Sequence, residues 1–365
     1  MKSLDLAWQR EQLEPEMTEA INEVLSRGDF INGAATSEFE SSFGAYIGAK
    51  HCVGCGNGTD ALELILEAMG IGPGDEVIVP AMTYVATSEA VLRVGASVIL
   101  ADVSEAAVIS ESAVIAAVTP RTKAVITVHL YGYPVDVETL QLALERLGRP
   151  DVVVIEDAAQ AHGASRRDRR AGSLGAAASF SFYPGKNLGA FGDAGAVTTD
   201  DAALAERIRR LANHGRLGKF DHELAGRNSR MDSLQGAVLG VKLTALDAWL
   251  ARRRAIAQEY LNRWSELDWL DLPQVPVDGE HAWHQFAVLV PDRAAFTDHL
   301  RGHGIPLGVH YPEALPEMSF HSEWPAADFP HAMKVARHEV SIPVGEHLSA
   351  EEVDKVVEVV GSFCP

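Results

Sequence analysis

Short apolar runs alternate with helical patterns between about Lys50 and Thr199, and this alternation restricts the chain to few folds. Apolar runs typical of buried strands lie at residues 52–53, 76–79, 97–100, 124–127, 152–155, 179–182 and 196–198. Between them, stretches such as 59–69 and 137–147 carry apolar residues at helical spacing. This order predicts an α/β fold with a mostly parallel central sheet flanked by helices. Because ligands of such sheets collect at the carboxyl ends of strands, functional residues are expected directly after the strands.

The last third of the chain changes character. A helical pattern begins near Asp232 and runs through Trp249 toward Trp264, before prolines interrupt it at 273 and 276. A strand-like run at 284–289 follows, with helical patterns near 294–302 and at 350–361. We expect a large α/β domain at residues 1–247 and a smaller C-terminal α+β domain at residues 248–365, hinged on the long helix.

The charge balance excludes several classes of protein. The 365 residues include 31 Lys and Arg against 51 Asp and Glu, a formal net charge of −20, which argues against general nucleic-acid binding. No apolar run is long enough to span a bilayer, and the N-terminus lacks the apolar core of a signal peptide, so a cytoplasmic location is expected. Cys52 and Cys55 form a C-x-x-C without a second pair, which predicts buried cysteines rather than a redox or metal site.

A lysine is presented by a glycine-containing loop after one predicted strand. The segment 179–189 reads SFSFYPGKNLG, and it places Lys186 between Gly185 and Gly189. A lysine nucleophile must lose its proton, and burial beside apolar groups lowers its pKa. A surface lysine in an ordinary loop is the competing interpretation.

Two carboxylates follow the predicted strand at 152–155. Asp157 is either the N-cap of a following helix or the charge partner of a bound ligand. Glu156 is expected to point to the opposite face, as a capping or solvated carboxylate. His162, a few residues on, is either a core histidine or a neighbour of the same ligand.

A third segment resembles a phosphate site. Gly58 and Thr59 open a helical pattern, where free backbone N–H groups and the helix dipole attract an anion. Ser181, shortly before the lysine, offers a hydroxyl to the same anion. Tyr84 follows another predicted strand and either stacks on a flat ligand ring or is a plain core aromatic.

Taken together, these segments resemble the DegT/DnrJ/EryC1/StrS sugar aminotransferases, which are fold-type I pyridoxal 5'-phosphate (PLP) enzymes. The resemblance covers nearly the whole chain. The matching motifs lie, in the family's order, at residues 28–33, 56–62, 72–79, 156–163, 179–189, 226–232 and 310–312.

The resemblance implies a role for each matched residue in the cofactor pocket. Lys186 is the Schiff-base lysine, and Asp157 holds the pyridine nitrogen of PLP protonated so that the ring accepts electrons. Gln160 contacts the ring hydroxyl, and Tyr84 stacks on the ring.

The resemblance also implies a shared phosphate site. Gly58, Thr59 and Ser181 bind the phosphate within one subunit. In the family, the Asn of an Asn-x-Arg motif reaches the cofactor phosphate of the neighbouring subunit, and Asn228 inherits that role. A homodimer with shared active sites is therefore expected.

The implied reaction moves an amino group from L-glutamate to a keto-sugar linked to dTDP or UDP. Residues 128–132 and Tyr183 are similar to members that aminate C3 of the hexose, and His310 with Tyr311 is expected to close the sugar site. Arg230 and the stretch 8–10 are candidate nucleotide contacts, although an ion pair at the interface is an equal interpretation for Arg230.

Other PLP proteins of this fold remain alternatives. These are a 4-keto-sugar aminotransferase, an aminohydroxybenzoate synthase-like enzyme, a sugar dehydratase and a PLP-binding regulatory protein. Lys186 argues against the dehydratase, which carries His at that place, and the net charge of −20 argues against the regulator. Arg227 and the segment 313–317 depart from the family's usual pattern, so the acceptor surface is less well predicted than the cofactor pocket.

Overall fold

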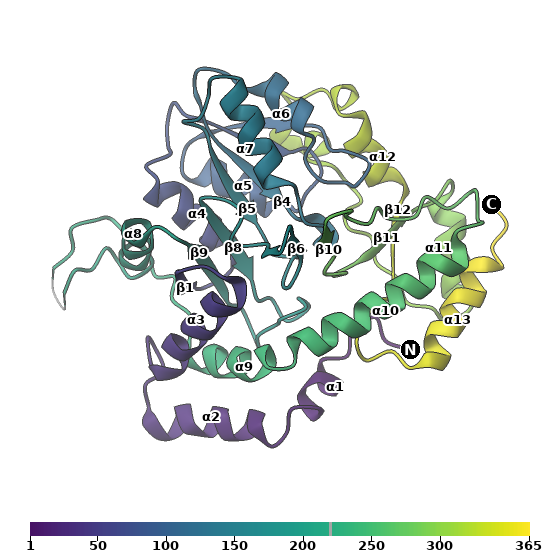
Figure 1. Ribbon diagram of the computed structural model, residues 1–365, viewed down its shortest axis with the longest axis horizontal. Helices are drawn as coiled ribbons and strands as arrows, with labels where there is room; N and C mark the ends of the chain where they lie inside the picture. The colour runs from purple at the N-terminus through teal and green to yellow at the C-terminus, as the bar shows by residue number, and fades with distance from the viewer. Residues whose placement is uncertain (219–220) are drawn as a thin grey trace.

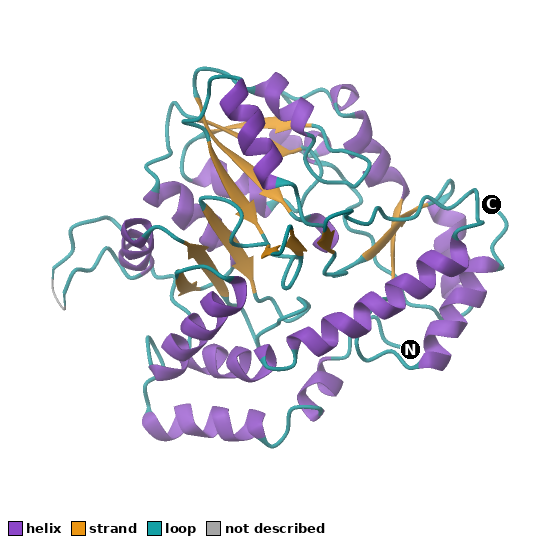
Figure 2. Cartoon of the chain, in the orientation of Figure 1, coloured by secondary structure: helices purple, strands orange, loops and turns teal. Residues whose placement is uncertain are grey.

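The central sheet forms as the sequence predicts. The computed structural model describes residues 1–218 and 221–365, and helices surround a twisted sheet in its larger part (Figures 1 and 2). In spatial order the strands are β1 (His51–Cys55), β9 (Gly195–Thr199), β8 (Ala177–Ser181), β5 (Val153–Asp157), β4 (Thr122–Val128), β2 (Glu76–Pro80) and β3 (Ser97–Ala101). Only β9 runs antiparallel to its neighbours, so the predicted mostly parallel α/β fold is confirmed.

Helices cover both faces of this sheet. The helices of this part of the chain are α1 (Leu6–Glu11), α2 (Glu16–Arg27), α3 (Ala34–Ile47), α4 (Gly58–Ala68), α5 (Ala86–Arg93), α6 (Glu111–Ala117), α7 (Val137–Arg146), α8 (Ala202–Ala212) and α9 (Ser233–Leu243). Of these, α2 packs against α9 rather than against the sheet (Figure 1). The patterns at 59–69 and 137–147 are confirmed as α4 and α7. The inner strands β2 and β9 are buried along their whole length and β4 nearly so, which explains the apolar runs at these positions.

The long helix predicted from Asp232 to Trp264 is wrong in one respect, because it is two helices. α9 ends at Leu243, and α10 (Leu246–Trp264) begins after a short break. At the break the Thr244 hydroxyl donates to the Val241 carbonyl at 2.8 Å, and the Ala245 amide donates to Lys242. These bonds to the third preceding residue replace the regular helical pattern, and α10 leads away from α9 toward the C-terminal elements (Figure 1).

The C-terminal elements build a second apolar core on α10. β11 (Phe286–Leu289) pairs antiparallel with β12 (Glu339–Ile342), and α11 (Arg293–Gly302) and α13 (Ala350–Gly361) contribute to the same core. Their apolar side chains pack with Tyr260 and Trp264 of α10. β11, α11 and α13 were predicted, whereas β12 was not.

One C-terminal helix belongs to the other core. α12 (Pro330–His338) packs Ala332, Met333 and Ala336 into the core of the central sheet. The boundary at residues 247/248 therefore stays a prediction. The remaining short elements are β6 (Ser165–Arg166), β7 (Arg169–Arg170), β10 (Gly279–Glu280) and the 3-10 turns η1 (Leu130–Gly132), η2 (Leu315–Glu317), η3 (Ser319–His321) and η4 (Ala326–Asp328).

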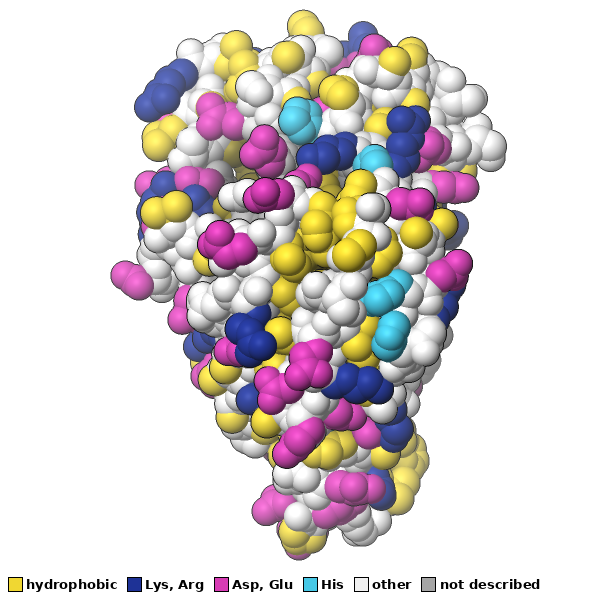
Figure 3. All heavy atoms as spheres, turned by 90° about the vertical axis from the view of Figure 1, so that its right-hand side faces the viewer, with side chains coloured by type: hydrophobic (Ala, Val, Ile, Leu, Met, Phe, Trp, Pro, Cys, Tyr) yellow, Lys and Arg dark blue, Asp and Glu magenta, His cyan; other side chains and the backbone are white. Residues whose placement is uncertain are grey.

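One face of the molecule carries charges of both signs, and two cysteines are buried as the sequence predicts. On the face that carries the C-terminal elements, acidic and basic side chains are interspersed around a hydrophobic strip (Figure 3). Cys52 and Cys55 lie buried on β1, where burial raises the pKa of both thiols. Across residues 1–218 and 221–365, the helices are all too short or too polar to cross a membrane.

Candidate active site

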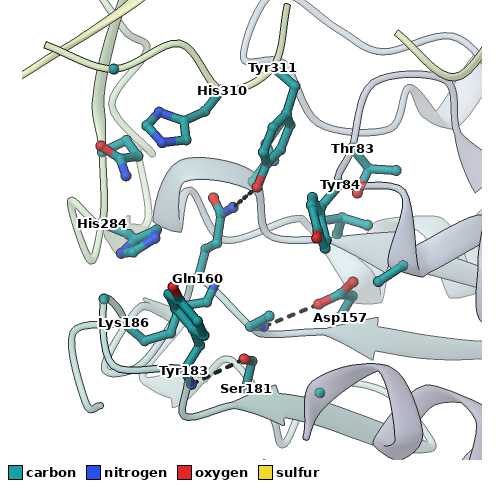
Figure 4. A pocket seen from close by; sticks show the side chains of 18 of the residues that line it. Thr83, Tyr84, Asp157, Gln160, Ser181, Tyr183, Lys186, His284, His310 and Tyr311 are labelled. Atoms are coloured by element: carbon teal, nitrogen blue, oxygen red, sulfur yellow. Dashed lines mark hydrogen bonds between the residues drawn. The ribbon is translucent and has the colours of Figure 1, made fainter. Parts of the chain in front are cut away.

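A cavity of about 920 Å³ opens at the carboxyl ends of β5 and β8. Ten of the predicted site residues line it, namely Gly58, Thr59, Tyr84, Asp157, Gln160, Ser181, Tyr183, Lys186, His310 and Tyr311. They come from five separate segments of the chain, and Figure 4 shows most of them around one space. Asn228 and Arg230 do not line it.

The loop after β8 presents Lys186 to this cavity. The Lys186 amide donates to the Tyr183 carbonyl at 2.8 Å, which closes a tight turn. A Cβ atom at Gly189 would lie 2.3 Å from the Pro184 carbonyl oxygen, so the loop can fold back only with glycine there. Burial lowers the pKa of Lys186 to about 8, against the opposing charge of Asp157. The surface-lysine interpretation is therefore wrong.

Asp157 is the last residue of β5, and no helix begins after it, so the N-cap interpretation is also wrong. Its Oδ2 accepts a hydrogen bond from the Thr87 hydroxyl at 3.0 Å, and its Oδ1 accepts one from the Ala159 amide at 3.2 Å. Burial raises the pKa of the carboxyl. Within residues 1–218 and 221–365 no cation forms an ion pair with it, so the site suits a ligand N–H⁺ group.

Glu156 corrects a prediction. It points to the face opposite Asp157, as expected from strand alternation, but it is 0% exposed and neither caps a helix nor meets solvent. Its carboxylate accepts the amides of Gly172, Leu174 and Gly175 at 2.7 Å each, and His129 Nε2 lies 2.9 Å away. A loop distant in sequence supplies these donors, which explains why the local pattern suggested solvent.

The N-terminus of α4 meets the end of β8. Asn57 caps the helix by accepting the Asp60 amide at 2.8 Å, and Gly58 is its first residue. A Cβ atom at Gly58 would lie 2.7 Å from Ser181 Cβ, so the two segments touch. The Ser181 oxygen accepts the Tyr183 amide at 3.3 Å, which leaves its proton free to donate. Helix amides and a hydroxyl thus converge in a form that fits a phosphate.

Gln160 is fixed in one orientation. Its Oε1 accepts the Tyr131 amide at 2.6 Å, and its Nε2 donates to the Tyr311 hydroxyl at 3.1 Å (Figure 4). The Tyr84 ring lies 5.4 Å from that of Tyr311 and is 54% exposed, so Tyr84 is not a core aromatic. Two tyrosines and an amide therefore stand on one side of the cavity.

Sequence reasoning missed several lining residues. His284 Nδ1 lies 3.2 Å from Asn187 Oδ1, and Asn187 donates to the Ala282 carbonyl at 2.8 Å. Burial holds the pKa of His284 well below its usual value. Thr83 and Thr87, which bond to each other at 2.9 Å, connect to Asp157. The one signal in the sequence for these residues was their position next to predicted site residues, because Asn187 follows Lys186 and Thr83 precedes Tyr84.

The structure gives other places to the remaining candidates. Asn228 is exposed and forms an isolated bridge with Asn213, whose side chain accepts a 2.9 Å hydrogen bond from Arg230. Arg227 pairs with Glu63 and Glu67 of α4.

Two further candidates are buried. His162 packs among Phe43, Phe180 and Phe182, with a pKa lowered to about 3 by burial, and is a core histidine. In the stretch 8–10, Gln9 is buried and bonds to Glu346 and Lys242, so its amide is not available to a nucleotide. The N-terminal segment reaches the cavity through Ser3 and Leu4 instead.

Comparison with known proteins identifies the family. The family model described as DegT/DnrJ/EryC1/StrS aminotransferase matches residues 11–361. A Streptomyces venezuelae protein, dTDP-3-amino-3,4,6-trideoxy-alpha-D-glucose transaminase, is 43% identical over 98% of this chain and 94% of its own. The dTDP-3-amino-3,6-dideoxy-alpha-D-galactopyranose transaminase of Aneurinibacillus thermoaerophilus is 43% identical over 99% and 98%.

The fold comparison agrees. The crystal structure of S. venezuelae DesV in complex with a ketimine intermediate superposes with a TM-score of 0.95, at 42% identity, over 98% of this chain and 97% of that one. Solved relatives include PLP-bound and PMP-bound forms, and the cofactor of this chain is PLP, which the buried Asp157, Lys186 and the phosphate site fit. The chain belongs to the DegT/DnrJ/EryC1/StrS aminotransferase family.

Proposed function

We propose that this aminotransferase moves an amino group from L-glutamate to C3 of a keto-hexose linked to dTDP or UDP. The observation that carries the proposal is that Lys186 lines one cavity together with a buried Asp157, which has no ion-pair partner among the described residues. The names of the two 43% identical relatives support the 3-amino product and the dTDP group. An aromatising aminohydroxybenzoate synthase-like reaction and a 4-keto-sugar acceptor are the alternatives.

PLP, when bound, supplies an electron sink and an amino carrier. Asp157 holds a proton on the ring nitrogen, and Thr87 and the Ala159 amide orient its carboxylate. Lys186, with a pKa of about 8, exists partly as the free amine near neutral pH. With PLP bound, the Lys186 amine would serve as general base and acid, moving the proton between the donor's α-carbon and the cofactor. Gly58, Thr59 and Ser181 anchor the phosphate.

The acceptor's orientation is assigned to three side chains around the cavity. Tyr183 is 59% exposed on the lysine loop, while His310 and Tyr311 stand across from it (Figure 4). We infer that they fix the sugar ring so that its C3 carbonyl would face the amino group that the cofactor carries. Misplacement by about 1 Å can cost about a hundredfold in rate, so such a wall is sufficient to select one carbonyl.

We also propose a homodimer in which Asn228 reaches the partner's cofactor phosphate. Asn228 is exposed in the single chain, and exposed apolar side chains, including Phe30, Ile31 and Phe191, support a surface that is covered by another subunit. Arg230, which lies beside Asn213, remains a candidate for the interface or the nucleotide. The cytoplasmic location stays a prediction.

Product analysis tests the proposal. The purified holoenzyme is first incubated with L-glutamate, which should convert the cofactor to its amino form with release of 2-oxoglutarate. It is then offered dTDP- and UDP-linked 3-keto and 4-keto hexoses, and the product is examined by NMR. An amino group at C4, or turnover only of a carbocyclic ketone, contradicts the proposed acceptor. Borohydride reduction followed by peptide mapping should place the cofactor on Lys186 and on no other lysine.

A further inference from the structure

The strand β12 brings Ser341 to the lining of the cavity and Glu339 next to Ser341. Glu339 and Ser341 are two residues apart on β12, so their side chains lie on the same face. The Gly308 and Ser341 backbones exchange two hydrogen bonds, of 3.1 and 2.9 Å. This pairing brings the chain that continues to His310 alongside that face of β12.

A continuous chain of hydrogen bonds joins the three residues. The Ser341 hydroxyl donates to Glu339 Oε1 at 2.5 Å, and His310 Nδ1 lies 2.8 Å from the same hydroxyl oxygen. Glu339 Oε2 accepts the backbone amide of His310 at 2.6 Å. Both carboxylate oxygens therefore accept a hydrogen bond, as an ionised carboxylate does.

This geometry fixes the proton on the imidazole. A serine hydroxyl has one proton, and Ser341 uses it to donate a hydrogen bond to ionised Glu339, so its oxygen accepts a hydrogen bond from His310. His310 Nδ1 therefore carries hydrogen. In the neutral ring, Nε2 then has a lone pair, and His310 lines the cavity.

The surroundings keep His310 neutral and its ring in place. Burial lowers the pKa of His310, and the charge of Lys186 across the cavity lowers it further. A Cβ atom at Gly308 would lie 2.5 Å from His310 Cε1, so the ring occupies the space that glycine leaves. The Tyr131 hydroxyl donates to the His310 carbonyl.

Glu339 itself is buried without an ion-pair partner within residues 1–218 and 221–365. Burial raises the pKa of Glu339 to about 7, while the Ser341 hydroxyl, the His310 amide and the charge of Arg293 lower it. A buried carboxylate of this kind is costly to keep. Because the carboxylate contacts Ser341 and His310, we connect its burial with the position of His310 in the active site.

We propose that Glu339 and Ser341 are positioning residues that hold His310 as the Nδ1–H tautomer, so that Nε2 accepts a hydrogen bond from a hydroxyl of the sugar. That this hydroxyl belongs to a sugar rests on the proposed function. The tautomer of His310 does not depend on the proposed function. His310 would thus distinguish an acceptor with a hydroxyl beside the reacting carbonyl from one without.

NMR of the PLP-loaded enzyme tests the tautomer directly. With ¹⁵N-labelled histidine, the two ring nitrogens of His310 are identified by the signals that are missing in His310→Gln. At pH 7.5 the wild type should show a protonated Nδ1 and an unprotonated Nε2. In Glu339→Gln the new amide donates to Ser341, which then donates to the ring, so the tautomer should reverse to Nε2–H. An Nε2–H wild type, or no difference between the two proteins, overturns the proposal.

A matched pair at Ser341 guards against misfolding of the Glu339 variant. Ser341→Thr keeps the hydroxyl and should keep the wild-type tautomer, whereas Ser341→Ala should give a mixture. Identical spectra for both variants would contradict the relay, that is, the chain of hydrogen bonds from Glu339 through Ser341 to His310.

The two half-reactions then separate the relay from the proposed function. Ser341→Ala should leave the rate with L-glutamate unchanged and lower kcat/KM for the keto-sugar by about tenfold, as for loss of one buried hydrogen bond. Ser341→Thr should restore it. If the tautomer is as stated but no keto-sugar reacts, the proposed acceptor fails and the relay stands. Equal losses in both half-reactions would refute a role toward the sugar.

Discussion

At the scale of single residues, burial shifts the pKa of the two groups that we propose hold the cofactor. Lys186 and Asp157 both lie in a protein environment that disfavours their charged forms, which lowers the pKa of the amine and raises that of the carboxyl. A nucleophilic amine benefits directly from this shift. The carboxyl benefits indirectly, since a buried carboxylate binds a ligand N–H⁺ group more strongly than an exposed one does.

The lowered pKa of Lys186 predicts how pH controls cofactor attachment. Only the neutral amine attacks an aldehyde, and its fraction rises with pH until the pKa is passed. The rate of PLP incorporation into apoenzyme should therefore rise about tenfold per unit below pH 8 and level off above it. Stopped-flow absorbance at a series of pH values measures this rate, with Lys186→Ala as the blank for other lysines. A rise that continues to pH 10 would show an unshifted lysine.

Asp157 should matter for turnover more than for cofactor binding. Asp157→Ala keeps the phosphate site and Lys186, but it removes the group that holds a proton on the ring nitrogen. We expect PLP to remain bound and the glutamate half-reaction to slow by about a hundredfold or more. Thr87→Val is the matched control, because it keeps Asp157 but removes the 3.0 Å hydrogen bond to its carboxylate, together with the 2.9 Å bond to Thr83, and should cost a few-fold. Near-normal rates in Asp157→Ala would mean that another residue holds the ring.

At the scale of elements, the site depends on a contact between the start of α4 and the end of β8. Gly58 permits this contact because it lacks a side chain, and the contact brings the helix amides and the Ser181 hydroxyl together at the proposed phosphate site. Helix propensity does not explain a glycine in the first turn of α4. The close approach of α4 to Ser181 explains it.

Gly58→Ala should therefore weaken PLP binding. The added methyl would lie 2.7 Å from Ser181 Cβ, and relieving the overlap must separate helix and strand. Overpacking of this kind costs roughly 1–3 kcal/mol, so we expect the dissociation constant of PLP to rise by about tenfold. Gly240→Ala on α9 is the control, since a Cβ atom there meets nothing within 4 Å. Absorbance titration of both variants gives the comparison, and equal affinities would refute the contact.

The elements also show what the sequence could and could not predict. The seven strands of the sheet were predictable because most of their residues are buried, which leaves short runs rich in apolar residues such as those of β2 and β4. The break at Thr244 was missed because threonine is compatible with a helix and its side-chain bond to Val241 is visible only in three dimensions. Glu156 was misjudged, and His284 was missed, because their partners come from segments distant in the chain.

At the scale of the whole molecule, one chain brings together most but not all of the proposed phosphate site. Gly58, Thr59 and Ser181 line the cavity, whereas Asn228 lies on the surface outside it. A second subunit is the simplest way to bring an exposed Asn228 to a cofactor. The exposed Tyr84, which lines the same cavity, is consistent with a site near the molecular surface.

Mixing two inactive proteins tests this arrangement. A Lys186→Ala subunit retains Asn228, and an Asn228→Ala subunit retains Lys186, so a mixed dimer contains one intact shared site and one doubly defective site. With random subunit exchange half of the dimers are mixed, and about a quarter of wild-type activity should return. Lys186→Ala mixed with Lys186→Ala/Asn228→Ala is the control and should stay inactive. If exchange is verified by mass spectrometry and activity does not return, each site is built from one chain, because no other arrangement leaves a mixed dimer without an intact site.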